Sequence, residues 1–178
     1  EYQLPNLVMA NSFFVVMRLQ IPPQSQASEL CKLRLSWDNS EQEERQRLLT
    51  SLTLPSVSDA QLADFPLDEE VQRQVILMLA ARAKKEAIAQ VDAGNYNEAS
   101  QILQNTHVQV LTAPSSSLVS QEAEALLDLD KDLKQRRVKE FRKSSHYQSH
   151  SYQRSWSQGE YEEYQAKRKK RYDKKDKK

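Results

Sequence analysis

Glycine is scarce in this sequence. Only two glycines occur among the 178 residues, Gly94 and Gly159, whereas glycine makes up about 7% of an average protein. Loops that hold phosphate groups need several glycines at fixed spacing, because the backbone must approach the ligand closely. The sequence therefore excludes a nucleotide-binding loop of this kind.

Cysteine is almost absent too, and Cys31 alone cannot form an internal disulfide. It falls on the apolar side of an expected strand, where we interpret it as a small buried hydrophobic residue. A zinc site needs three or four ligands, but no Cys or acidic residue is suitably placed beside His146 and His150. We expect no catalytic residue, metal or cofactor in this chain, and we predict that it is not an enzyme.

Long hydrophobic runs are missing as well. The longest uninterrupted one, Val75–Ala81, has seven residues, against the ~20 that span a bilayer. No signal peptide is visible, so we expect a soluble, cytoplasmic protein with no membrane span. The chain starts with Glu1 rather than Met, and we interpret it as a piece of a longer protein.

The net charge of +1 is unevenly distributed. From Lys167 to Lys178 there are nine Lys or Arg and two Asp, so the remainder of the chain is net acidic. Residues 144–158 are rich in Ser, Gln, His and aromatic residues. This composition predicts a largely flexible tail over residues 144–178, polar and aromatic at first and then basic.

Alternation of apolar and polar residues marks three stretches, 13–21, 29–37 and 47–54. Such a period of two is typical of strands with one buried face, and the short polar connections indicate hairpins. We predict an antiparallel β-meander of about three strands within residues 1–66. A sheet of this size is marginal alone, so we expect residues upstream of this chain to complete it.

Helical patterns follow the prolines at 55 and 66. Asp68 is a suitable N-cap for a helix that runs to about Ala93, and Gly94 suits the turn after it. Further helices are expected over about 96–111 and 120–143. We predict an antiparallel three-helix domain over residues 67–143, and the fold class is α+β.

Two resemblances carry further expectations. The segment Gly94-Asn95-Tyr96-Asn97-Glu98-Ala99 resembles the turn of tetratricopeptide-like helical hairpins, in which glycine takes the left-handed conformation. The order of elements resembles the region that follows the A domain in bacterial von Willebrand factor type A domain-containing proteins. It is carried by the segments Ile21-Pro22-Pro23, Leu33–Asp38, Asp68–Val71, Ala80–Ala87, Gly94–Ala99 and Arg142-Lys143.

This second resemblance implies an accessory β-plus-helical module beside an A domain that lies upstream of Glu1. The metal site of that family needs an Asp-x-Ser-x-Ser loop, and no such string occurs in this sequence. The resemblance therefore implies that any Mg²⁺ is bound by the upstream domain. The basic stretch 167–178 departs from what the family would show.

Together these observations predict a structural or protein-interaction module whose partners are other proteins and its own upstream A domain. We predict that the interaction involves the residues Phe141, Arg142, Lys143, Tyr147, Tyr152 and Trp156. The alternative is binding of nucleic acid or an anionic surface through the basic tail, because aromatic side chains stack on bases and lysines neutralise phosphates.

Overall fold

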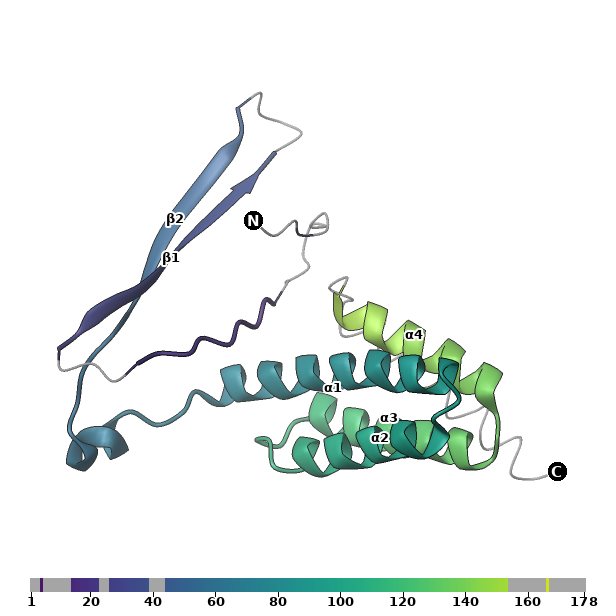
Figure 1. Ribbon diagram of the computed structural model, residues 1–178. Helices are drawn as coiled ribbons and strands as arrows, with labels where there is room; N and C mark the ends of the chain where they lie inside the picture. Colours follow the sequence, from purple (N-terminus) through teal and green to yellow (C-terminus); the bar gives the residue numbers. More distant parts are fainter. Residues whose placement is uncertain (1–3, 5–13, 23–25, 39–43, 154–165, 167–178) are drawn as a thin grey trace. The chain divides into compact units, whose positions relative to one another are not determined.

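The structure is a computed structural model that describes residue 4, residues 14–22, 26–38, 44–153 and residue 166 (Figure 1). A two-stranded antiparallel sheet precedes the helices, so the fold is α+β. The chain divides into two compact units, and one of them, Met17–Pro66, holds the sheet. The α-helices belong to the other unit. In chain order the elements are β1 (Ser28–Trp37), β2 (Gln46–Leu54), a 3₁₀ helix η1 (Asp59–Asp64), α1 (Glu69–Asp92), α2 (Tyr96–Val110), α3 (Ser117–Lys134) and α4 (Val138–Gln153).

The strands β1 and β2 form a hairpin. In their register Cys31 lies opposite Leu52, and Leu35 lies opposite Leu48. The register shifts by one residue between Glu29 and Cys31, as a β-bulge does. Two of the three predicted strands are thus confirmed, with bounds within one residue of those expected.

The prediction of a third strand is wrong. Residues 14–22 are described, and none of them belongs to a strand. Their alternation fits a strand, but Phe14 and Val16 make the intervening positions apolar as well, so the pattern does not select one face. Pro22 also has no N–H to donate to a sheet. The sheet has two strands within the part of the chain that the structure describes.

The start and end of α1 follow the expected local chemistry. The Asp68 carboxylate accepts a hydrogen bond from the Val71 N–H at 3.0 Å. At the other end Gly94 adopts φ 83°, and its N–H donates to the Val91 carbonyl at 3.1 Å. The Asn95 N–H donates to the Gln90 carbonyl at 2.8 Å. These two bonds form a Schellman motif around a left-handed glycine, so this turn is confirmed.

The core of the helical unit lies between its four helices. Helix α1 lies alongside α2 and α4, and α3 packs against α2 (Figure 1). The buried apolar cluster consists of Ala80, Ala87, Ile88, Val91, Ala99, Leu103, Val110, Val119, Ala123, Leu126, Leu129, Leu133 and Phe141. Four of these residues are alanines, which let the helices approach closely.

The prediction of three helices is also wrong, because the expected third helix is divided. Helix α3 ends at Lys134, and α4 begins at Val138. Between them Arg136 adopts φ 58°, and the N–H groups of Arg136 and Arg137 donate to the carbonyls of Leu133 and Asp132. This is the same Schellman motif as at Gly94, but an arginine occupies the position where glycine is usual. Because this position is not glycine, the sequence contained no signal that one helix ends and another begins here.

The helical region also extends further than expected. Residues 144–153, which were assigned to a flexible tail, form the second half of α4. Their buried positions Ser145, Gln148 and Ser149 are polar, so the stretch lacks the apolar stripe that usually marks a packed helix. The predicted tail beyond Gln153 lies outside the described residues, apart from residue 166.

Candidate interaction surface

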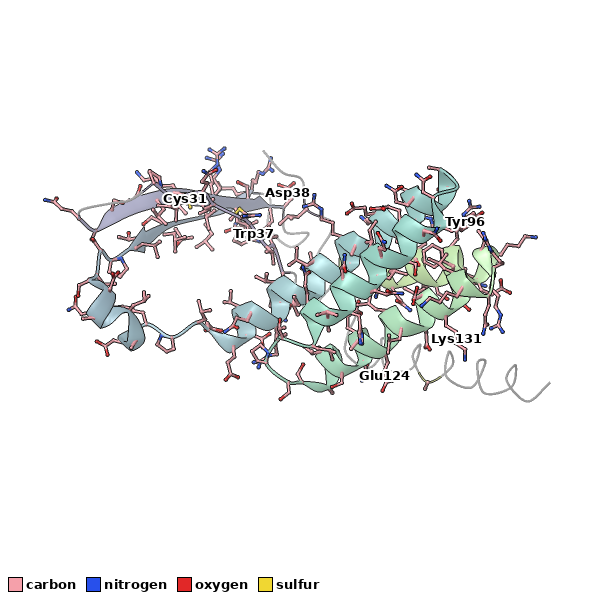
Figure 2. All side chains as sticks on the ribbon, turned by 60° about the horizontal axis from the view of Figure 1, so that its bottom comes forward. Cys31, Trp37, Asp38, Tyr96, Glu124 and Lys131 are labelled. Atoms are coloured by element: carbon pink, nitrogen blue, oxygen red, sulfur yellow. The ribbon has the colours of Figure 1, made fainter. Side chains whose placement is uncertain are left out.

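The pairing of β1 with β2 places most of the apolar residues of both strands on one side of the sheet, although Leu49 lies on the other side. Leu35 faces the same way as Leu48, because residues directly opposite each other share a face. We call this side the apolar face. Its apolar members are Cys31, Leu33, Leu35, Trp37, Leu48, Leu52 and Leu54. Figure 2 shows Cys31 and Trp37 on the hairpin.

The apolar face is exposed. Trp37 retains 42% of its accessible surface and Leu48 52%, and the other large side chains of this face lie between 38% and 44%. A large apolar side chain in a folded sheet is normally covered by a second layer. Within its own unit, Met17–Pro66, no described residue covers this face, and all six of its large side chains are exposed.

The opposite side of the sheet is basic, and we call it the basic face. Lys32 lies opposite Ser51, Arg34 opposite Leu49, and Ser36 opposite Arg47. Lys32 forms an ion pair with Glu29 at 3.6 Å, but both side chains are exposed, so the pair contributes little. The sheet is therefore amphipathic, with three cations on one side and an uncharged apolar surface on the other.

A small hollow lies at the open end of the hairpin. It has a volume of about 250 Å³ and is lined by Ile21, Pro22, Gln26, Ser28, Leu30, Leu54, Pro55, Ser56 and Val57. None of these side chains is titratable, so the lining holds no base that could activate the hydroxyl of Ser28 or Ser56. It extends the apolar surface of the sheet toward the strand ends.

A second hollow, open and about 680 Å³ in volume, lies where α1 meets α2. Its lining is polar, and the guanidinium of Arg136 stacks 4.8 Å above the ring of Tyr96. Tyr96 lies at the start of α2 (Figure 2). The hollow is wide, and its residues are mostly exposed. It lacks the low-dielectric enclosure in which a carboxylate becomes a general acid.

Four charged side chains among the described residues are buried inside the helical unit, and three of them belong to two arrangements that join helices. Lys84 of α1 lies 2.5 Å from Glu122 of α3, and both side chains are fully buried. Asp130 of α3 accepts hydrogen bonds from Ser100, from Gln104 at 3.0 Å and from Lys134 at 2.6 Å. Both arrangements join helices, and we interpret them as structural.

The carboxyl of Asp130 titrates below its ordinary range. Burial by itself would raise its pKa, but the hydrogen bonds from Lys134, Ser100 and Gln104 stabilise the charged form and together lower it. The donors come from α2 and from the next turn of α3. The network therefore couples the packing of these helices to the ionisation of one side chain.

The predicted interaction residues have different environments. Phe141 is fully buried in the core of the helical unit. Arg142 forms an ion pair with Asp92 at 2.5 Å, Lys143 is exposed, and Tyr147 is 37% exposed. Tyr152 belongs to α4, although its side chain is not among those described, and Trp156 lies outside the described residues. Of the six predicted interaction residues, Arg142, Lys143 and Tyr147 are thus the ones with exposed side chains on α4.

Cys31 is half-buried, rather than fully buried as expected. No group of three or more His, Cys, Asp or Glu side chains able to hold a metal ion occurs among the described residues. In the same part of the chain, no helix is long and apolar enough to cross a bilayer. The basic stretch 167–178 is not described, so nucleic-acid binding through it stays a prediction from composition.

Comparisons with protein-family models, with curated proteins and with solved structures find no match for this chain. The resemblance to the region after a von Willebrand A domain therefore stays a prediction, and the exposed sheet is the strongest functional feature. The strand pattern had named the residues of the apolar face. It had not shown that Arg34 and Arg47 lie together on the other face, because this depends on the register of the hairpin.

Proposed function

We propose that the chain is a non-enzymatic protein-interaction module that acts through the apolar face of the β1–β2 hairpin. We further propose that it is the C-terminal accessory region of a cytoplasmic von Willebrand A-domain protein. The observation that carries the proposal is the uncovered row of leucines with Trp37 on a two-stranded sheet.

The physical reason is the free energy of exposed apolar surface. Covering the remaining half of a leucine side chain contributes about 1 kcal/mol, on a scale of 1.5–3 kcal/mol for complete burial. Six large side chains on one face together make a substantial driving force for association. A two-stranded sheet has little stability without a covering layer, so a partner would also stabilise the hairpin itself.

The setting in an A-domain protein is supported by the order of strand hairpin and helices, as described for the sequence. In this proposal the upstream domain and other proteins are the partners, and any Mg²⁺ belongs to the upstream domain. This chain contributes a surface and no ligand to the metal.

Leu48 and Leu49 provide a matched pair for the test. They are neighbours in β2, they are the same residue type, and they are on opposite faces, with 52% and 68% of their surface exposed. A photo-crosslinking amino acid is placed at either position in the full-length protein, which is expressed in its own cells and irradiated. We expect a discrete crosslinked product from position 48 and little or none from position 49.

Equal amounts of product from both positions would show nonspecific association rather than binding through one face, and would overturn the proposal. The absence of any product at position 48, with the protein folded by circular dichroism, would overturn it as well. The mass of a product at position 48 distinguishes a second copy of this protein from a different partner.

A further inference from the structure

We infer that the partner of the apolar face is the same face of a second copy of this chain. This inference rests on the proposed function and names the occupant of the surface. Two hairpins would pack face to face as a small four-stranded sandwich, with their layers about 10 Å apart as in other sheet-on-sheet packing.

The composition of the apolar face makes it self-complementary. In a twofold arrangement each copy presents the same patch to the other, so a charge on the face would need an opposite charge elsewhere on the same face to pair with. The face carries no charged side chain. Its polar members are Ser28, opposite Leu54, then Thr50, opposite Leu33, and Gln46, which lies at the turn end of β2 and donates to the Glu44 carbonyl at 3.2 Å. No unpaired charge would be buried by the contact.

The basic face limits the association to two copies. Lys32, Arg34 and Arg47 would point outward from both sides of the sandwich. Glu29, paired with Lys32, lies on the same face, and the face still has an excess of positive charge. Two such faces repel each other when they approach directly. A third hairpin could therefore not stack on the pair, and the assembly would close as a dimer instead of growing into a filament.

The surface area fits a weak dimer. Summed over two copies, the exposed parts of the six large apolar side chains reach the roughly 1,000 Å² that separates a specific interface from an accidental one. An interface at this lower limit is expected to dissociate on dilution. We expect a dissociation constant of the order of 1 μM to 100 μM, which corresponds to about 5–8 kcal/mol.

Sedimentation velocity of the 178-residue chain over about 1–300 μM, a range that brackets this affinity, tests the inference. We compare the unmodified chain with Leu48→Glu, Leu48→Thr and Leu49→Glu. Leu48→Thr retains a residue that favours strands, so it keeps the test valid if the glutamate unfolds the hairpin. Leu49→Glu places its carboxylate opposite Arg34 on the basic face and is the matched control.

We expect a reversible monomer–dimer equilibrium for the unmodified chain and for Leu49→Glu. Both substitutions of Leu48 should weaken dimerisation at least about tenfold, the effect of losing one well-packed side chain. Cys31, the one cysteine of this chain, should react with a maleimide more slowly as the chain concentration rises. In the Leu48 variants the slowing should begin only at a chain concentration at least about tenfold higher.

A monomer at every concentration, association without a discrete dimer, or equal weakening by the Leu48 and Leu49 substitutions would each overturn the inference. The proposed function would survive a monomeric result if position 48 crosslinks to a different protein in cells. It would fail separately if position 48 gives no product there. The two failures are thus distinguishable.

Discussion

Lys84 and Glu122 lie at the centre of the helical unit, where their charges are removed from water. Moving each charge out of water costs several kcal/mol, and the ion pair at 2.5 Å offsets this cost. Such a pair adds little stability compared with apolar residues of the same size. Its removal from one side only, however, leaves a buried charge without its partner.

The substitution Lys84→Met should therefore destabilise the helical unit by about 3–5 kcal/mol. The double variant Lys84→Met with Glu122→Met should recover most of this loss, because neither charge of this pair is then left in the core. Urea unfolding followed by helical circular dichroism measures both values. A single variant as stable as the unmodified chain would show that the pair is not buried in solution.

Asp130 gives the helical unit a defined sensitivity to acid. Its pKa is lowered in the folded state, so the folded state favours the charged carboxylate more than the unfolded state does. The resulting stability is present above the unfolded pKa of about 3.9. It is lost as the pH falls from there through the lower folded pKa.

Asp130→Asn should lower the free energy of unfolding by about 1–3 kcal/mol at neutral pH. The difference from the unmodified chain should stay constant down to about pH 5 and shrink below about pH 4. Lys134→Met removes one of the donors, so it should bring the folded pKa of Asp130 closer to the unfolded pKa and narrow the pH range over which this stability is lost. A difference that grows toward acid pH would contradict the assignment of the charged form to the folded state.

At the scale of the elements, α4 is the helix whose start and extent the sequence pattern did not predict. Its buried positions include Ser145, Gln148 and Ser149, so no apolar stripe marked it. The turn before it is made by Arg136, whose side chain is held over the ring of Tyr96. A cation–π contact of this kind contributes about 0.5–1 kcal/mol, which helps to offset the cost of a left-handed conformation for a residue other than glycine.

Helix α4 is attached to the unit mainly through its buried residues. Substitutions at two adjacent positions, one buried and one on the surface, compare the contribution of core packing with that of a surface ion pair. Phe141→Ala should cost about 3–5 kcal/mol, because it leaves a cavity in the core. Arg142→Ala breaks an ion pair whose partners are about half exposed and should cost under about 1 kcal/mol. Both are measured by urea unfolding. Equal costs would contradict the placement of Phe141.

The hairpin was largely predictable, but the number of strands in the sheet was not. Alternation in residues 29–37 and 47–54 marked the strands and their apolar face. Pairing depends on contacts distant in sequence, so alternation in residues 14–21 could not show that this stretch lacks a partner strand. The helix starting at Asp68 and the turn at Gly94 were predictable because both depend on chemistry within a few residues.

On the scale of the whole molecule, the two units have contrasting surfaces. The helices bury a core of leucines and alanines within their own unit, whereas the sheet leaves its leucines exposed. No sequence pattern distinguishes an apolar strand face that is covered within its own chain from one that is covered by another molecule. Only the coordinates show that the described residues of its own unit do not cover it.

Hydroxyl-radical footprinting of the assembled full-length protein tests the central claim most directly, because it reports the solvent access of individual side chains. We predict that Trp37, Leu48 and Leu52 are protected in the assembled protein. Trp37 and Leu52 should become reactive in the Leu48→Glu variant, while Leu49 is oxidised in both. Equal oxidation of Leu48 and Leu49 in the assembled protein would contradict the claim that the apolar face is a protein interface.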